Sequence, residues 1–281
     1  MTKRNRSDGW TYAKISGHTN EDLVKKLLDT DINYRTNFLT RLGMANNSII
    51  STSVGGIHET NVDGILGKKT KSKTDLKVCL NNGKKINKRI KKSLSGQVYL
   101  IKADSFIKIF NKRFEQSIPS DVQRAIKLFW SASDDANEII QQYADKSNNK
   151  NYNSQLKHNS LNATTLKKYN KELYNSLLLW FSNNIYELTK LSFAMGAAVS
   201  KDTWADYVWY INLLGDYNID CIFNINTLCY AAQSVAKTET YYGDKNGGTT
   251  IQLPFGFVQW HQQKMQFHHS YEKISKLINN L

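Results

Sequence analysis

The sequence predicts a mixed α+β fold, because stretches with the periodicity of strands lie on both sides of stretches with the periodicity of helices. Residues 74–80 and 86–91 alternate apolar and polar side chains, as half-buried strands do. Residues 120–143 and 164–198 repeat apolar side chains every three or four positions, as helices do. After Lys201 the period returns to two. This order of elements is typical of α+β or mixed α/β chains, and 281 residues are ample for a hydrophobic core.

The other expected elements follow from local turn and cap residues. A helix is expected to begin near residues 17–22, where Thr19 or Asn20 can cap it. Asn81-Asn82-Gly83 predicts a hairpin turn between the first two strands, and residues 46–74 predict loops with a short hairpin. Further along we expect a strand running into a helix over residues 97–110, an exposed loop over 147–163, strands over 219–226, 249–253 and 255–267, a turn at Gly247-Gly248, and a short helix from His269.

The chain carries a large excess of positive charge. Lys and Arg total 38 against 24 Asp and Glu, which gives a net charge of +14. Such a surplus favours a polyanionic partner, with nucleic acid ahead of an anionic membrane surface. The longest apolar run, residues 176–181, is too short to span a bilayer, and no apolar segment follows the basic residues 1–6. The three cysteines form no paired or metal-binding motif. We therefore expect a cytoplasmic protein without a membrane partner.

The most informative motif spans the hairpin between the first two predicted strands. The alternation places Asp75 on the polar face of one strand and Lys91 on the polar face of its neighbour. A carboxylate and an ammonium placed in this way suit phosphodiester hydrolysis. The carboxylate holds Mg²⁺, and the metal polarises the phosphate and lowers the pKa of a bound water. The lysine orients or deprotonates the nucleophile and neutralises charge on the phosphate.

This motif resembles the core of the PD-(D/E)XK nucleases, in which an Asp on one strand is followed on the next strand by an acidic or polar residue, any residue and a Lys. Lys73-Thr74-Asp75 together with residues 87–93 is most similar to small four-base-cutting type II restriction endonucleases with a polar-x-Lys variant. The resemblance implies that Glu21, on the first helix, helps Asp75 to hold Mg²⁺. It also implies that residues 264–267 belong to a terminal segment that contacts bases.

The resemblance implies a restriction-endonuclease-like core, which is a mixed β-sheet flanked by helices. We expect a basic N-terminal arm in residues 1–16, a catalytic nuclease core in 17–118, a helical insertion in 119–200, and a C-terminal β region in 201–281 that completes the fold and contacts bases. The implied activity is Mg²⁺-dependent cleavage of double-stranded DNA at a short site, by a monomer or a homodimer. A cognate DNA methyltransferase would protect the host.

One position departs from the family pattern. The family carries an acidic or polar residue two positions before the lysine, whereas Arg89 stands there in this chain. Arginine has no acceptor for a metal. A water or another carboxylate then fills that place, or Arg89 neutralises phosphate, or activity is impaired. A second register is also open, with Asp63 as the first aspartate and Asp75-Leu76-Lys77 as a literal D-x-K. Both registers keep Asp75.

Two features suggest a surface that binds DNA. Lysines cluster around the predicted hairpins, among them Lys73 and Lys92, and would bind phosphates. The stretch 252–269 interleaves aromatic residues with Gln, His and Lys at the strand period, and Gln and Lys are side chains that read adenine and guanine. Gln266 and His268 are the best candidates for base contacts by resemblance. The full set of expected DNA-binding residues is Lys73, Lys92, Gln97, Gln259, His261, Lys264, Gln266 and His268.

Two other functions remain open at this point. One is a sequence-specific DNA-binding protein that has lost catalysis, with Arg89 as the symptom. The other is an RNA-binding protein, which the charge and the aromatic residues also suit.

Overall fold

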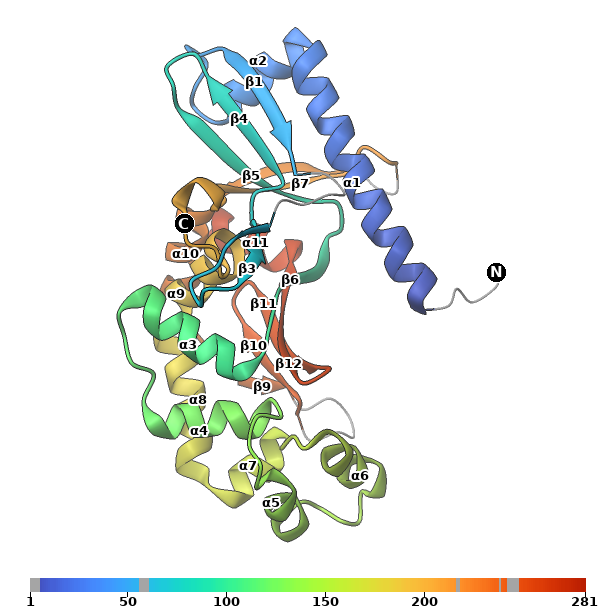
Figure 1. Cartoon of the computed structure of the whole chain (residues 1–281), viewed down its shortest axis with the longest axis vertical. Coiled ribbons are helices and arrows are strands. Elements are labelled where there is room, and N and C mark those ends of the chain that lie inside the picture. Colours follow the sequence, from blue (N-terminus) through green and yellow to red (C-terminus); the bar gives the residue numbers. More distant parts are fainter. Residues whose placement is uncertain (1–5, 56–60, 216–217, 238, 242–247) are drawn as a thin grey trace. The chain divides into compact units, whose positions relative to one another are not determined.

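The computed structural model of the chain describes residues 6–55, 61–215, 218–237, 239–241 and 248–281 (Figure 1). It divides into two compact units, each built from two segments of the chain. The first unit comprises Met1–Leu94 and Phe193–Asn226, and the second comprises Ser95–Ser192 and Thr227–Leu281. These boundaries cut across the segments expected from the sequence, because strands that follow the helical region pair with strands that precede it.

The first unit contains a mixed five-stranded sheet. Its only parallel neighbours in the described chain are β5 and β7, with Lys88 opposite Tyr207; the other neighbours are antiparallel. The strands lie in the order β1 (Ile49–Val54), β4 (Leu76–Leu80), β5 (Lys85–Lys91), β7 (Tyr207–Ile211) and β8 (Asp220–Asn224). A separate two-stranded hairpin joins β2 (Asn61–Asp63) to β3 (Lys69–Lys71).

Two helices cover one face of this sheet. Along α1 (Arg6–Thr30) the buried residues include Val24 and Leu28, and along α2 (Ile32–Arg41) they include Phe38. They pack against the inward side chains of β4, β5 and β7 in one apolar cluster. Each fully buried side chain of this kind contributes about 1.5–3 kcal/mol. The alternation predicted for residues 74–80 and 86–91 thus faces this core, and the Asn81-Asn82-Gly83 turn joins the two strands as predicted.

The second unit contains an antiparallel five-stranded sheet and most of the helices. Its core combines aliphatic side chains with aromatic rings, where Phe106 contacts Phe267 at 6.0 Å and Phe110 contacts Trp180 at 4.9 Å between ring centroids. The strand order is β6 (Ser95–Ile101), β12 (Lys264–Ser270), β11 (Gly256–His261), β10 (Thr250–Leu253) and β9 (Glu239–Tyr241). The helices are α3 (Ala103–Phe114), α4 (Ser120–Phe129), α5 (Ala136–Tyr143), α6 (Asn149–His158), α7 (Ala163–Tyr169), α8 (Lys171–Asn183), α9 (Ile185–Lys190), most of α10 (Ile225–Ser234) and α11 (Tyr271–Asn279).

The expected start of the first helix is wrong. From Arg6 onward the predicted N-terminal arm is part of α1, so Thr19 and Asn20 lie inside the helix. Their polar side chains have other uses. The Thr19 hydroxyl donates to the carbonyl of Ile15 in the preceding turn, and Asn20 bonds to backbone outside the helix.

The helical region is more broken than its apolar period predicts. Residues 120–143 form two helices, separated near Ser131, whose φ of 60° is left-handed. Asn170 interrupts residues 164–198 by capping α8, where its side chain accepts from two backbone N–H groups. The predicted loop over residues 147–163 contains α6, which Asn148 caps. Asparagine caps therefore set helix boundaries that the spacing of apolar residues does not indicate.

The predicted strand over residues 255–267 is a hairpin, β11 and β12. Its turn residues Gln262 and Gln263 both have positive φ, 48° and 59°, as a two-residue turn of the primed type requires. No Gly or Asn marks this turn in the sequence. The strands β1 and β7 and the helix α10 were also not predicted individually, and Gly247 of the predicted Gly247-Gly248 turn lies outside the described residues. Within the described ranges, no helix is long and apolar enough to cross a membrane.

Candidate active site and polar strand face

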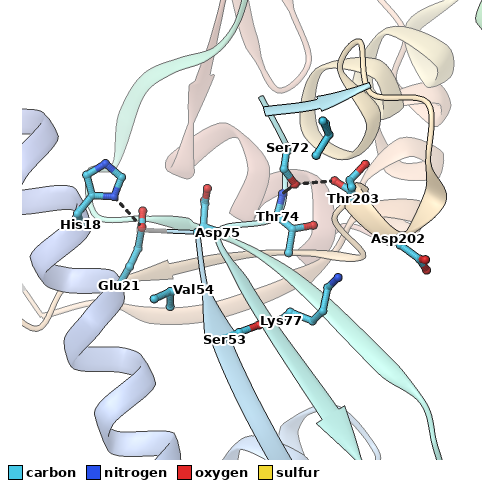
Figure 2. Close-up of a pocket in the computed structure, with 12 residues that line it drawn as sticks. His18, Glu21, Ser53, Val54, Ser72, Thr74, Asp75, Lys77, Asp202 and Thr203 are labelled. Carbon is cyan, nitrogen blue, oxygen red and sulfur yellow. Dashed lines mark hydrogen bonds and ion pairs between the residues drawn. The ribbon is translucent and has the colours of Figure 1, made fainter. Parts of the chain in front are cut away.

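A pocket in the first unit gathers residues from α1, β1, β4 and the segments before β4 and β7 (Figure 2). Its volume of about 170 Å³ leaves room for several water molecules. The lining is mostly polar. It consists of His18, Glu21, Ser53, Val54, Gly55, Val62, Ser72, Thr74, Asp75, Lys77, Asp202 and Thr203.

Asp75 is held by backbone bonds to strands on both sides. Its N–H donates to the Lys88 carbonyl at 2.9 Å, and its carbonyl accepts from the Gly55 N–H at 3.1 Å. Its carboxylate oxygen Oδ2 accepts from the Ile90 N–H at 2.8 Å. The carboxylate therefore has a fixed orientation beside the pocket.

Glu21 reaches the same pocket from α1. Its side chain is 13% exposed, and its Oε2 lies 3.1 Å from Nδ1 of His18, one helical turn earlier. Figure 2 shows the side chains of Glu21 and Asp75 extending into one space from the helix and from the start of the strand. The structure thus brings together the two carboxylates that the sequence proposed as metal ligands.

This donor set fits a Mg²⁺ ion whose remaining ligands come from water and from the phosphates of a nucleic acid. Mg²⁺ takes oxygen ligands, and it is commonly held by one or two carboxylates while waters and substrate phosphates complete the shell. Glu21 and Asp75 supply the two carboxylates. No group of three or more His, Cys, Asp or Glu with metal-binding spacing occurs among the described residues, so an all-protein cage is not part of the described site.

Arg89 and Lys91 lie on β5 and belong to the same electrostatic neighbourhood. Arg89 is 9% exposed, and its Nη1 donates to the Phe193 carbonyl at 3.3 Å. Burial lowers the pKa of Arg89, and Asp75 opposes that shift. Burial lowers the pKa of Lys91 to about 7; repulsion from Arg89 adds to the shift, and Asp75 and Glu21 oppose it. Lys91 thus interacts electrostatically with both carboxylates, and Arg89 interacts with Asp75.

Lys73 belongs to this cluster as well. It is 8% exposed, and burial lowers its pKa well below the ordinary value; Arg89 and Lys91 add to the shift and Asp75 opposes it. Gly196 lies against its stem, since a Cβ on this glycine would be 2.5 Å from Lys73 Cε. The sequence predicted Lys73 as a contact to DNA phosphate, and the structure places it in the buried part of the site.

The structure brings together only part of the alternative register, which consists of Asp63, Asp75 and Lys77. Lys77 lines the pocket beside Asp75. Asp63 has a side chain that is 81% exposed and pairs with Lys69 at 2.7 Å, and it is not among the described residues that line the pocket. The structure therefore brings Asp75 together with Glu21 and Lys77 at the pocket, places Lys91 within electrostatic range of both carboxylates, and leaves Asp63 at the surface.

His18 and Gly196 were not predicted from the sequence as parts of the site. A signal for His18 did exist, because a residue three positions before a helical glutamate lies on the same face of the helix. Nothing local to Gly196 indicates its contact with Lys73, which lies far earlier in the chain.

A second group of predicted residues forms a polar chain across the sheet of the second unit. Gln266 on β12 donates to Gln97 Oε1 on β6 at 2.8 Å and accepts from Gln259 on β11 at 2.9 Å. Gln259 Nε2 also lies 3.3 Å from His268 Nε2. The His268 ring stacks on Phe257 with centroids 4.5 Å apart. Four polar residues from three strands, together with Phe257, thus share one face of the sheet.

The remaining predicted DNA-binding residues lie at ends of strands. His261 and Lys264 face each other across the last pair of the β11–β12 hairpin. Lys92 follows directly after β5 and is half-buried.

Comparison with known proteins supports the architecture. A solved structure described as restriction endonuclease MspI in complex with its cognate DNA matches with a TM-score of 0.51, at 12% identity, over 94% of this chain and 93% of that one. The fold resembles that of MspI. At this identity the likeness shows the fold alone, and it confirms the predicted mixed α/β architecture with a central mixed sheet and flanking helices. No family model and no curated protein matches the sequence.

Proposed function

We propose that this protein is a Mg²⁺-dependent endonuclease that cleaves double-stranded DNA at a short recognition sequence, as type II restriction enzymes of the PD-(D/E)XK kind do. The observation that carries the proposal is the pocket in which Glu21 and Asp75 meet, with the Asp75 carboxylate bonded to the N–H of Ile90, between Arg89 and Lys91 on β5. The likeness of the fold to a restriction endonuclease supports it.

In this proposal each charged group of the site has one role. Glu21 and Asp75 hold Mg²⁺, which when bound polarises the scissile phosphate and lowers the pKa of a water. Lys91 lies close to these carboxylates, and its pKa of about 7 lets Nζ hold or release a proton near neutral pH. It orients the attacking water and takes up its proton.

Arg89 contributes fixed positive charge. Its guanidinium cannot ligate a metal, because all its nitrogens are donors. Held at the Phe193 carbonyl and close to Asp75, it compensates the negative charge that develops on the phosphate. Lys73, which is buried beside it, acts within the site rather than on a distant phosphate.

The polar face of the second unit is proposed as the surface that reads bases. The glutamine amides of Gln97, Gln259 and Gln266 and the ring of His268 offer donors and acceptors of the kind that read base edges. Lys264 and His261 at the hairpin end, and Lys92, extend the contacts to DNA. Such an enzyme works in the cytoplasm, as a monomer or a homodimer, beside a methyltransferase that protects the host DNA.

The test is cleavage of unmethylated plasmid and phage DNA with Mg²⁺ and with EDTA. We expect discrete fragments that require Mg²⁺. Asp75→Asn should abolish them, with a loss of about a thousandfold or more, since metal-based charge stabilisation is worth several kcal/mol. Lys91→Met should also abolish them, whereas Asp63→Asn serves as the matched carboxylate control and should cleave like the wild type, because its ion pair is exposed.

Other outcomes would redirect the proposal. Loss of cleavage in Asp63→Asn and in Lys77→Met, with activity kept in Lys91→Met, would favour the Asp75-Leu76-Lys77 register. A folded wild type that binds duplex DNA but cleaves none of several DNAs would favour the second candidate, a binding protein without catalysis. The arginine at the position of a metal ligand is the observation behind that candidate.

A further inference from the structure

Two residues that closely precede Glu21 on α1, Asn20 and His18, each make a specific buried contact. Asn20 is fully buried, and its Nδ2 donates to the Ile211 carbonyl at 3.0 Å. Its Oδ1 accepts from the Leu213 N–H at 2.8 Å. One side chain thus supplies the donor and the acceptor that a neighbouring strand would offer to the end of β7. These bonds set the position of α1 at the residue next to Glu21.

His18 makes the second contact, directly with the Glu21 carboxylate. Nδ1 of His18 lies 3.1 Å from Oε2, and the two side chains are 9% and 13% exposed. Both line the pocket that contains Asp75, and Figure 2 shows the ring directed at the carboxylate. Burial matters here, because a mostly desolvated hydrogen bond holds an orientation that an exposed one would not.

We propose that His18 is a positioning residue, which holds the Glu21 carboxylate in the orientation that serves the pocket, while Asn20 fixes the helix that carries both. This inference rests on the proposed function, in which Glu21 and Asp75 hold Mg²⁺. Histidine and carboxylate partners of metal ligands orient those ligands, and their loss commonly weakens metal binding 10–100-fold. His18 acts here through Glu21 and not as a ligand in its own right.

The experiment measures metal binding directly, with the full-length chain. Mn²⁺ takes the same oxygen ligands as Mg²⁺, and its binding is followed by loss of the free-ion EPR signal, with Mg²⁺ as competitor. The variants are His18→Ala, His18→Gln, Glu21→Gln and the double variant His18→Ala/Glu21→Gln. Lys25→Ala is the matched control, because it breaks another pair on the same helix, Lys25 with Asp29, away from the pocket.

We expect His18→Ala to weaken Mn²⁺ binding about 10–100-fold, as loss of an orienting partner does. His18→Gln keeps a donor within reach of Glu21 and should restore most of the affinity. Adding His18→Ala to Glu21→Gln should change nothing further, because the two residues act as one unit. Lys25→Ala should bind like the wild type.

Three results would overturn the inference while leaving the proposed function in place. These are wild-type affinity in His18→Ala, no rescue by glutamine, or a double variant that is weaker than Glu21→Gln by the full factor of the histidine change. The last result would make His18 an independent ligand. A wild type that neither binds Mn²⁺ nor cleaves DNA would overturn the proposed function and this inference together. Thermal melting of each variant separates these losses from unfolding.

Discussion

The two units bury polar groups in opposite ways. In the first unit, charged side chains are buried together, with Lys73 and Arg89 both less than 10% exposed near Asp75. In the second unit, the polar face is built of neutral amides, and Gln266 has a bonding partner on each side. Buried charge is costly unless it is fully compensated, whereas a satisfied amide chain costs little. The first arrangement therefore lowers the stability of the folded chain, whereas the second costs little.

One lysine in each unit tests this difference most strongly. Lys88 is fully buried, and its Nζ lies over the rings of Tyr207 at 3.9 Å and Phe38 at 4.7 Å, with no hydrogen-bond partner in the described structure. Lys273 in the second unit instead donates to Gln252 Oε1 at 3.0 Å and to the Gly256 carbonyl at 3.1 Å. We expect Lys88→Met to stabilise the protein by about 1–4 kcal/mol, as hydrophobic replacement of buried charge can, and Lys273→Met to destabilise it.

The effect at Lys88 should depend on pH with a definite sign. Burial lowers its pKa to about 6, with repulsion from Arg41 adding to the shift and Asp206 opposing it. The unfolded chain keeps the proton to about pH 10.5, so between pH 6 and that value the unfolded state binds more protons and stability rises with pH. The advantage of Lys88→Met should be largest below pH 6 and disappear toward pH 10.5. Urea unfolding at several pH values measures it, and an advantage that grows with pH would contradict the assignment.

Changes in the polar strand face should alter sequence preference and leave the chemistry intact. Gln266→Leu removes the central amide of the chain. If this face reads bases, discrimination at one or two positions of the recognition site should fall by about 1–3 kcal/mol, while the dependence on Mg²⁺ is unchanged. Cleavage of a library of single-base variants of the site measures this. The comparison between the units would fail if Gln266→Leu abolished cleavage of every sequence to the same extent as Asp75→Asn.

A pair of glycines provides the smallest test, within the first unit. Gly196 and Gly43 both have left-handed φ values, 54° and 68°. Alanine at either position should lower the free energy of unfolding by about 1–2 kcal/mol because of the backbone conformation alone. Gly196→Ala must also displace Lys73, whereas nothing lies within 4 Å of a Cβ at Gly43. We expect both variants to melt earlier, and Gly196→Ala to lose cleavage as well. Equal cleavage by the two variants would remove Lys73 from the site.

The sequence by itself determined the strands and the turn that carry Asp75 and Lys91. Their alternation and the Asn81-Asn82-Gly83 turn are local signals, and a short hairpin leaves few choices of partner. The pairing of Asp75 with the β5 backbone follows from that hairpin. The class of fold was also predictable, because the order of periodic segments excludes most architectures.

Only the tertiary structure decided what surrounds this hairpin. The parallel partner of β5 is β7, which follows after a long crossover connection. No local sequence signal identifies the strand with which β7 pairs. The same holds for Gly196 under Lys73, for the Phe193 carbonyl that receives Arg89, and for Asn20, whose cap-like side chain bonds to the end of β7 instead. These contacts join distant parts of the chain, so they depend on packing and not on local propensity.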